Sequence, residues 1–244
     1  MIKRPPIDWK DLQNQVSDVL SKSGLASETN KAVKTVRGSV NIDVYAEDNT
    51  TQPTTTYLCE CKHWRENVTK TIVHAFRTVV LDYGANWGFI ISSSGFQSGA
   101  YEAAEKSPIR LLTWDEFQEL FVDRWIQNYL TSRLNIADPL IEYTEPINSR
   151  IFRKAGKLNV DKQNRFKELR EKYYKLGFLA ISFLVSPARA RENLPLRNNL
   201  LNNGDYGLPD DLIDATYLQD FVDIYCRYAI EAIVEFDLVF GERA

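Results

Sequence analysis

The sequence predicts an α/β domain over about residues 1–130, followed by an α-helical region over residues 131–244. Short apolar runs alternate with longer stretches of helical periodicity as far as about Leu130, and no comparable strand pattern follows. The chain is 44% hydrophobic and 12% aromatic over 244 residues, enough for a sizeable core. Two X-Pro pairs, Asp138-Pro139 and Glu145-Pro146, mark the connection between the two regions.

The first half of the α/β domain is predicted to be one helix and three strands. Apolar residues recur every three or four positions over residues 9–23, and Gly24 follows as a stop, which predicts a helix. Partial alternation over residues 31–46, broken at Gly38, favours two paired strands. A polar turn over residues 48–56 then leads into a third strand over residues 57–62.

The second half of the domain alternates helices with strands. Helical periodicity over residues 69–83 ends at Gly84, and a buried strand is expected over residues 87–92. A helix over residues 98–106 and a strand over residues 109–112 come next. Thr113 is a good N-cap for a helix over residues 114–130, and Glu116 completes a capping box.

The C-terminal region is predicted to be helical. Residues 161–176 carry one apolar stripe on a polar stretch, residues 177–185 are more apolar, and residues 218–239 have a long helical pattern rich in aromatics. The segment 193–209, with its Asn, Gly and Pro residues, predicts a loop.

Charge is segregated along the chain, although the formal net charge is only −3. Residues 150–197 hold 13 Lys or Arg against 4 Asp or Glu, whereas residues 198–244 hold 2 basic and 10 acidic residues. The basic block offers Arg153, Lys154 and Lys157 as contacts for DNA phosphates, or it forms an ordinary solvated helix face. The acidic end is expected to pack within the molecule, to mask the basic block or to bind a protein partner.

Bulk features also favour a cytoplasmic protein with no membrane partner. No apolar run approaches 18 residues, and the first ten residues are polar and interrupted by prolines. Three cysteines are too few for a disulfide scaffold, so Cys59, Cys61 and Cys226 are expected to be reduced and mostly buried. Cys59, Cys61 and His63 would share one strand face, but alternate spacing on one strand is poor for tetrahedral zinc.

The candidate catalytic residues are Asp43, Glu60 and Lys62. Residues two apart on a strand share a face, so Glu60 and Lys62 point the same way, and Asp43 lies on a neighbouring apolar run. Two carboxylates, together with the backbone carbonyl of Cys61, are suitable ligands for Mg²⁺. A nearby ammonium suits hydrolysis of a phosphodiester, because it orients water or balances developing charge. The alternative without a catalytic function is an exposed cross-strand ion pair.

The order of these elements and motifs resembles the Mrr-like branch of the PD-(D/E)XK nuclease superfamily. The resemblance covers roughly residues 9–121 and rests on an opening helix, residues 38–44 (GSVNIDV), the triplet 60–62 (ECK), a helix, and residues 88–96 (GFIISSSGF). It implies a restriction-endonuclease-like core with a mixed central sheet flanked by helices. It also implies a Mg²⁺-dependent DNA endonuclease, with Mn²⁺ able to substitute, in which Asp43 and Glu60 bind metal and Lys62 is catalytic.

Two positions depart from the family pattern. Members often carry a glutamate on the first helix that joins the metal site, and the nearest match here is the neutral Gln13. A position often acidic in relatives, two before Asp43, is Asn41. These departures leave the number of metals open, and they support the alternative of a nuclease-like module that binds DNA or protein without cleaving it.

Further residues are candidates for substrate contact. His74 and Arg77 lie three apart on the helix after the triplet and are expected either to face a scissile phosphate or to form a solvated edge. Ser93 and Ser94 offer hydroxyls to DNA, although strand-to-helix loops use the same residues without function.

The resemblance places the activity in restriction or defence against foreign DNA, with repair of junctions or flaps as a further alternative. Double-strand cleavage needs two sites, so a homodimer is expected.

Overall fold

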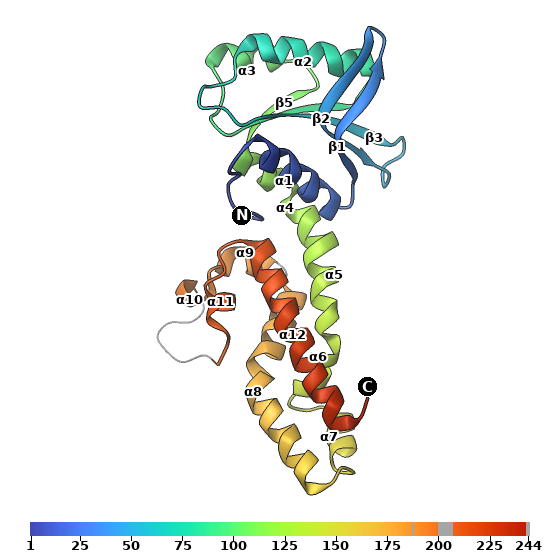
Figure 1. The fold of residues 1–244 in the computed structure, drawn as a ribbon, viewed down its shortest axis with the longest axis vertical. Coiled ribbons are helices and arrows are strands. Elements are labelled where there is room, and N and C mark those ends of the chain that lie inside the picture. Colours follow the sequence, from blue (N-terminus) through green and yellow to red (C-terminus); the bar gives the residue numbers. More distant parts are fainter. Residues whose placement is uncertain (187, 200–206, 243–244) are drawn as a thin grey trace. The chain divides into compact units, whose positions relative to one another are not determined.

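The computed structural model describes residues 1–186, 188–199 and 207–242. The chain divides into two compact units, Met1–Asn128 and Tyr129–Ala244 (Figure 1). This division falls two residues before the boundary expected between residues 130 and 131. Each unit is described below by itself.

A five-stranded mixed sheet forms the centre of the N-terminal unit. Its strands lie in chain order and comprise β1 (Ala26–Thr35), β2 (Gly38–Asp48), β3 (Thr55–Lys62), β4 (Trp87–Ser92) and β5 (Ile109–Thr113). The first three strands pair antiparallel, whereas β3, β4 and β5 pair parallel. The predicted α/β class with a mixed central sheet is therefore confirmed.

Helices cover both faces of this sheet (Figure 1). The helices α2 (Lys70–Tyr83) and α3 (Ser98–Ala104) pack on one face, where Val73 and Phe76 join Leu58 and Ile90 in a core cluster. The helices α1 (Trp9–Lys22) and α4 (Trp114–Trp125) lie on the other face. The predicted capping box is confirmed at α4, where the Thr113 hydroxyl accepts from the Glu116 backbone and the Glu116 carboxylate accepts from the Thr113 backbone.

Two element boundaries in this unit differ from expectation by more than two residues. Strand β1 begins at Ala26 rather than at residue 31, because its polar first residues pair along the full length of β2, starting at Ala26↔Glu47. Their exposed side chains give no hydrophobic alternation that sequence could reveal. Helix α4 ends at Trp125 and continues as a π-helical turn over Ile126–Leu130.

The secondary-structure elements of the C-terminal unit, over its described residues, are all helices joined by short turns. They form α5 (Thr131–Leu134), a 3₁₀ turn (Asn135–Ala137), α6 (Asp138–Thr144), α7 (Ser149–Ala155), α8 (Val160–Val185), α9 (Ala188–Asn193), α10 (Leu196–Asn199), α11 (Asp210–Ile213) and α12 (Leu218–Phe240). The long helices α8 and α12 pack side by side (Figure 1). Aromatic rings hold this core together, with Tyr143 stacked on Phe236 at 4.7 Å and Phe166 edge-on to Phe236.

Two predictions for this region need correction. The segment with two X-Pro pairs is not merely a connection, because α6 and α7 form there, and Pro139 is tolerated in the first turn of α6. The predicted loop 193–209 contains the short helix α10, and residues 200–206 lie outside the described part of the chain.

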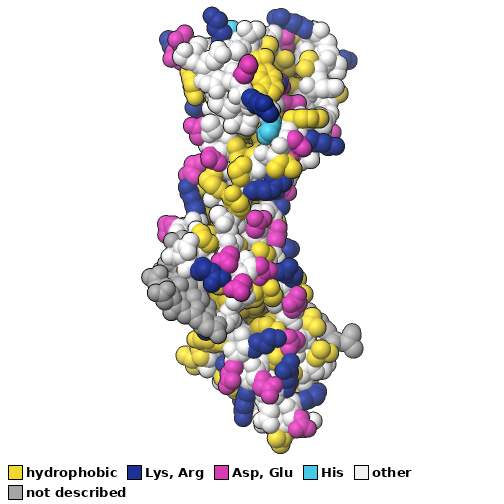
Figure 2. Space-filling view, turned by 60° about the vertical axis from the view of Figure 1, so that its left-hand side comes forward, with side chains coloured by type: hydrophobic (Ala, Val, Ile, Leu, Met, Phe, Trp, Pro, Cys, Tyr) yellow, Lys and Arg dark blue, Asp and Glu magenta, His cyan; other side chains and the backbone are white. Residues whose placement is uncertain are grey.

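The basic block and the acidic end pair with each other within this unit. Glu235 on α12 accepts from Arg165 at 2.7 Å and from Lys172 at 2.8 Å, both on α8. Lys154 on α7 pairs with Glu242 beyond α12. Figure 2 accordingly shows Lys, Arg, Asp and Glu side chains interspersed over the helical unit rather than gathered by sign. Among the described residues, no helix combines the length and apolarity needed to cross a bilayer.

Candidate active site

The site begins where β2 separates from β3. These strands pair as far as Val44↔Cys59, while β3 continues beside β4 to Lys62↔Ser92. Asp43 lies one residue beyond the last β2–β3 pair, and its Oδ2 accepts a hydrogen bond from the Cys61 backbone N–H at 2.7 Å. A side-chain carboxylate therefore takes the place that a backbone partner would have, which fixes Asp43 beside the triplet Glu60-Cys61-Lys62.

Glu60 and Lys62 lie on the same side of β3, as strand alternation predicts. Their carboxylate and ammonium form a short ion pair, and both side chains are largely buried. The Lys62 Nζ also lies 5.0 Å from the centre of the Trp64 ring. The structure thus brings Asp43, Glu60, Cys61 and Lys62 together at the carboxyl end of β3.

The carboxylate of Glu60 is held in an unfavourable environment. Burial raises its pKa, the hydrogen bond from Lys62 opposes this effect, and the negative charge of Asp43 raises the pKa further. A group with these perturbers gains from a nearby cation, so the electrostatics suit a divalent metal. The thiols of Cys59 and Cys61 are different, because burial raises the pKa of both and keeps them protonated. All three cysteines are buried and free, as predicted.

Gln13 on α1 is a second hydrogen-bond partner of Asp43. Its side chain is only 5% exposed, and its Nε2 donates to Asp43 Oδ1 at 2.7 Å. Both Asp43 oxygens are therefore hydrogen-bonded, one to the β3 backbone and one to α1. The Gln13 Oε1 is buried and has no hydrogen-bond partner. An orphaned buried acceptor on the side chain that binds Asp43 fits a site that receives a cation or a bound water.

The donor set limits how a metal would be held. Among the residues that the structure describes, no group of three or more His, Cys, Asp and Glu side chains could hold a metal. Asp43 and Glu60 are hard oxygen ligands, and Mg²⁺ usually keeps several waters besides one or two carboxylates. The residues present therefore fit one Mg²⁺ that completes its shell with the Cys61 carbonyl, the Gln13 amide oxygen, water or substrate.

The predicted accessory residues on α2 make other contacts. Arg77 donates to the carbonyl of Ala103 at the end of α3 at 3.2 Å and lies 3.2 Å from His74 Nδ1. The contacts of both side chains are therefore with α2 and α3.

Ser93 and Ser94 hold the loop that follows β3. The Ser93 hydroxyl donates to the Trp64 carbonyl at 3.2 Å, and the Ser94 hydroxyl donates to the Glu66 carbonyl at 2.7 Å. This loop presents Trp64, which is 45% exposed, and the exposed Arg65. Sequence reasoning missed both residues, although their place directly after Lys62 was a usable signal, because functional loops often follow catalytic strands.

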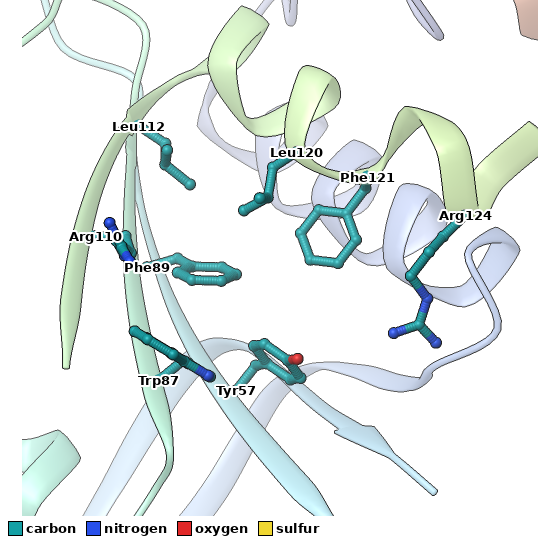
Figure 3. Close-up of a pocket in the computed structure, with 8 residues that line it drawn as sticks. All are labelled: Tyr57, Trp87, Phe89, Arg110, Leu112, Leu120, Phe121 and Arg124. Atoms are coloured by element: carbon teal, nitrogen blue, oxygen red, sulfur yellow. The ribbon is translucent and has the colours of Figure 1, made fainter. Parts of the chain in front are cut away.

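A hollow lies between α4 and the strands β3, β4 and β5 (Figure 3). It has a volume of about 420 Å³. We call it the aromatic pocket, and it is lined by Tyr57, Trp87, Phe89, Arg110, Leu112, Leu120, Phe121 and Arg124. No residue predicted for the active site lines it.

Comparison with known proteins gives one family and one weak structural likeness. Residues 5–121 match the family model Mrr_cat, described as "Restriction endonuclease". No curated protein is significantly similar to the chain. A crystal structure of the protein of unknown function AF1548 shares 16% identity with this chain, covers 97% of it and 100% of its own chain, and has a TM-score of 0.41.

Proposed function

Since residues 5–121 belong to the Mrr-type restriction endonuclease family, whose fold is PD-(D/E)XK, we propose that this protein is a Mg²⁺-dependent DNA endonuclease that hydrolyses phosphodiester bonds. Family membership supports a nuclease, and a nuclease of this family implies a DNA substrate. The single observation that carries the proposal is the bond from the Cys61 backbone to Asp43 beside the Glu60–Lys62 pair. Restriction or defence against foreign DNA is the proposed setting.

Each site residue receives a role from its position. Asp43, fixed by two hydrogen bonds, and Glu60, whose charge is destabilised by burial, would hold the metal with the Cys61 carbonyl. Bound there, Mg²⁺ or Mn²⁺ would supply Lewis-acid stabilisation of the phosphate and acidify a bound water. Lys62 shares the partly buried edge with Glu60, so its ammonium orients the attacking water or stabilises the charge that develops on the phosphate.

DNA would reach the site along the loop that carries Trp64 and Arg65. Arg65 is exposed and would pair with a backbone phosphate, while the Trp64 ring lies within 5.0 Å of the catalytic ammonium. Hydrophobic side chains lie beside Lys and Arg on the N-terminal unit in Figure 2, a mixture that suits nucleic acid. Arg153, Lys154 and Lys157 remain proposed as phosphate contacts of the helical unit.

A second candidate is a nuclease-like module that binds DNA or protein without cleaving it. Gln13 favours it, because this neutral residue occupies one oxygen of Asp43 where family members often carry an acid. A structure-specific repair nuclease would use the same site on another substrate. The helical unit would then serve as the surface for DNA, a protein partner or a second copy.

The deciding experiment is incubation of methylated and unmethylated plasmid with wild-type protein and with Lys62→Ala, in Mg²⁺ and in EDTA. We expect the wild type to nick or linearise plasmid in Mg²⁺ only. We expect the cleavage rate of Lys62→Ala to be lower by about 10²–10⁴-fold. Arg37→Ala, on the β1–β2 turn, is the matched control for loss of one positive charge. Equal cleavage by wild type and Lys62→Ala would remove the proposed site.

Two further measurements separate the alternatives. DNA binding without cleavage of any plasmid form would favour the binding module, whereas cleavage confined to flaps or junctions would favour the repair nuclease. Gel filtration with and without DNA tests the proposed homodimer, and a monomer under both conditions would contradict it.

A further inference from the structure

The aromatic pocket is built by two layers of the N-terminal unit. Its floor consists of side chains from β3, β4 and β5, and its other wall consists of side chains from α4 that point toward them (Figure 3). Three rings pack against one another within it: Tyr57 lies 5.5 Å from Phe89, and Phe121 lies 6.1 Å from Phe89. The rings thus form a rigid apolar surface large enough to cover a planar ligand.

Two arginines, Arg110 and Arg124, lie beside this apolar surface, and they differ in the groups that they contact. Arg124 pairs with the buried Asp48 at 2.5 Å, and this pairing lowers the pKa of Asp48 to about 2, so both groups are charged. Arg110 is exposed and lies 5.3 Å from the Trp87 ring. Within the described part of the chain, no carboxylate is recorded against Arg110. The pocket therefore carries one positive charge without a counter-ion.

The polar groups of the pocket are mainly donors. Trp87 offers an indole N–H, Arg124 retains guanidinium N–H groups beyond the one that binds Asp48, and Tyr57 offers a hydroxyl. No hydrogen bond is recorded for Trp87 Nε1 or the Tyr57 hydroxyl among the described residues. A complementary ligand must be planar, rich in acceptors and negatively charged at one end.

We propose that the aromatic pocket binds a nucleotide, with the base against the aromatic rings and the phosphate on Arg110. Bases have flat π-faces that stack on aromatic side chains and arginine planes, and their ring nitrogens and carbonyls are acceptors. Arginine is well suited to phosphate because its planar fork donates two parallel hydrogen bonds. The volume of about 420 Å³ lies in the range of small-molecule sites.

This site is separate from the catalytic residues. Tyr57 precedes Glu60 by three positions and Lys62 by five on β3, which places it about 10–17 Å away along the strand. Because both separations are odd, Tyr57 lies on the opposite face of the sheet from Glu60 and Lys62. A nucleotide in the pocket is thus not the scissile nucleotide, and it comes from solution or from a single-stranded end of bound DNA.

The test is calorimetric titration of the full chain with dGMP and with deoxyguanosine, in EDTA. We expect saturable binding of dGMP and binding of deoxyguanosine that is at least about tenfold weaker, as befits loss of a charge-assisted hydrogen bond. Arg110→Gln should weaken the binding of dGMP by a similar factor and leave the affinity for deoxyguanosine unchanged. Leu120→Glu, at an exposed position of the pocket mouth, should weaken dGMP more than its uncharged control Leu120→Gln.

Lys62→Ala is the control for nucleotide binding at the catalytic residues, and its affinity for dGMP should equal that of the wild type. Absence of binding at millimolar dGMP would overturn the proposal, as would equal affinity for dGMP and deoxyguanosine. Loss of binding in Lys62→Ala, or no effect of Arg110→Gln, would place the nucleotide elsewhere. None of these results depends on whether the protein cleaves DNA.

The two sources of the nucleotide are distinguished by competition. A duplex with a 5′-phosphorylated single-stranded overhang and the same duplex with blunt ends are each titrated against the dGMP complex. Displacement by the overhang alone, weakened by Arg110→Gln, supports a DNA end as the ligand. No displacement by either duplex supports a free nucleotide.

Discussion

The carboxylates of the candidate site in the N-terminal unit and Glu235 in the helical unit lie in opposite electrostatic environments. In the N-terminal unit, Asp43 and Glu60 lie together at one end of the sheet with Lys62 beside them, and burial raises the pKa of Glu60. In the helical unit, Glu235 accepts hydrogen bonds from basic residues of α8, and its pKa is lowered. A carboxylate whose charged form is destabilised by its surroundings is typical of a functional site. A carboxylate that is paired with basic residues is typical of a structural role.

One buried polar side chain from each unit shows the same contrast. The buried Asp237 of α12 accepts a hydrogen bond from the Tyr143 hydroxyl at 2.7 Å. The buried Gln13 of α1 satisfies only its nitrogen, and its Oε1 has no partner. A satisfied group specifies packing, and an orphaned acceptor on the side chain that binds Asp43 points to a missing ligand.

The largest expected effect separates the two units by activity. Asp43→Ala should reduce plasmid cleavage in Mg²⁺ by about 10³-fold, because a fixed metal ligand is lost. Arg227→Ala in the helical unit, which breaks an exposed ion pair with Asp211, should change cleavage by less than about threefold. Initial rates of nicking measure both. An equal loss of cleavage in the two variants would contradict the proposal that the N-terminal unit carries the active site.

The second prediction concerns packing of the helical unit. A Cβ at Gly177 would lie 2.0 Å from Thr144 Oγ1, so Gly177→Ala should destabilise the unit by about 1–3 kcal/mol although Ala is the better helix former. Denaturant unfolding measures the loss. Adding Thr144→Ala removes the clashing hydroxyl and should recover part of it. If Gly177→Ala were more stable than the wild type, the space between α6 and α8 would be large enough for the added methyl group.

The third prediction uses the buried ion pair of the N-terminal unit. Arg124 is the main cause of the low pKa of Asp48, about 2 against an ordinary 3.8, so ionised Asp48 stabilises the fold by about 2 kcal/mol at neutral pH. The folded pKa is the lower one, so this contribution is present above pH 3.8 and is lost as pH falls toward 2. Asp48→Asn should therefore lower stability at pH 7 and much less near pH 2.

Arg197→Ala is the control for this pH dependence. Arg197 pairs with Asp210 and Asp214 on the exposed surface of the helical unit. Thermal unfolding from pH 2 to pH 7 should show a smaller effect for this exposed pair than for Asp48→Asn. A pH-independent loss in Asp48→Asn would mean that packing, rather than charge, sets its cost.

The smallest expected effect is on DNA affinity through the helical unit. Lys157 is exposed, and no partner is recorded for it among the described residues. If it contacts phosphate, Lys157→Gln should weaken DNA binding a few-fold and reduce the slope of log affinity against log salt by about 1. Arg65→Gln, on the catalytic loop, provides the matched measurement in the other unit. An unchanged salt slope in Lys157→Gln would leave the helical unit without a DNA contact there.

Periodicity was sufficient to place most elements of the N-terminal unit. Helices α1 and α2 and strands β3 and β4 bury apolar residues at the spacing that their geometry requires. The start of β1 was missed because its side chains are exposed, so burial left no pattern. Helices α6 and α7 were missed because two X-Pro pairs suggested a break, whereas Pro139 sits in a first turn.

The sequence by itself predicted the fold class and the shared face of Glu60 and Lys62, because strand alternation places residues two apart on the same side of a strand. It could not show that Asp43 bonds the Cys61 backbone, that Gln13 leaves one oxygen unpaired, or that β3, β4, β5 and α4 enclose a pocket. Nor could it show that the basic block and the acidic end neutralise each other. Those facts depend on contacts between residues far apart in the chain, which only tertiary packing brings within hydrogen-bonding distance.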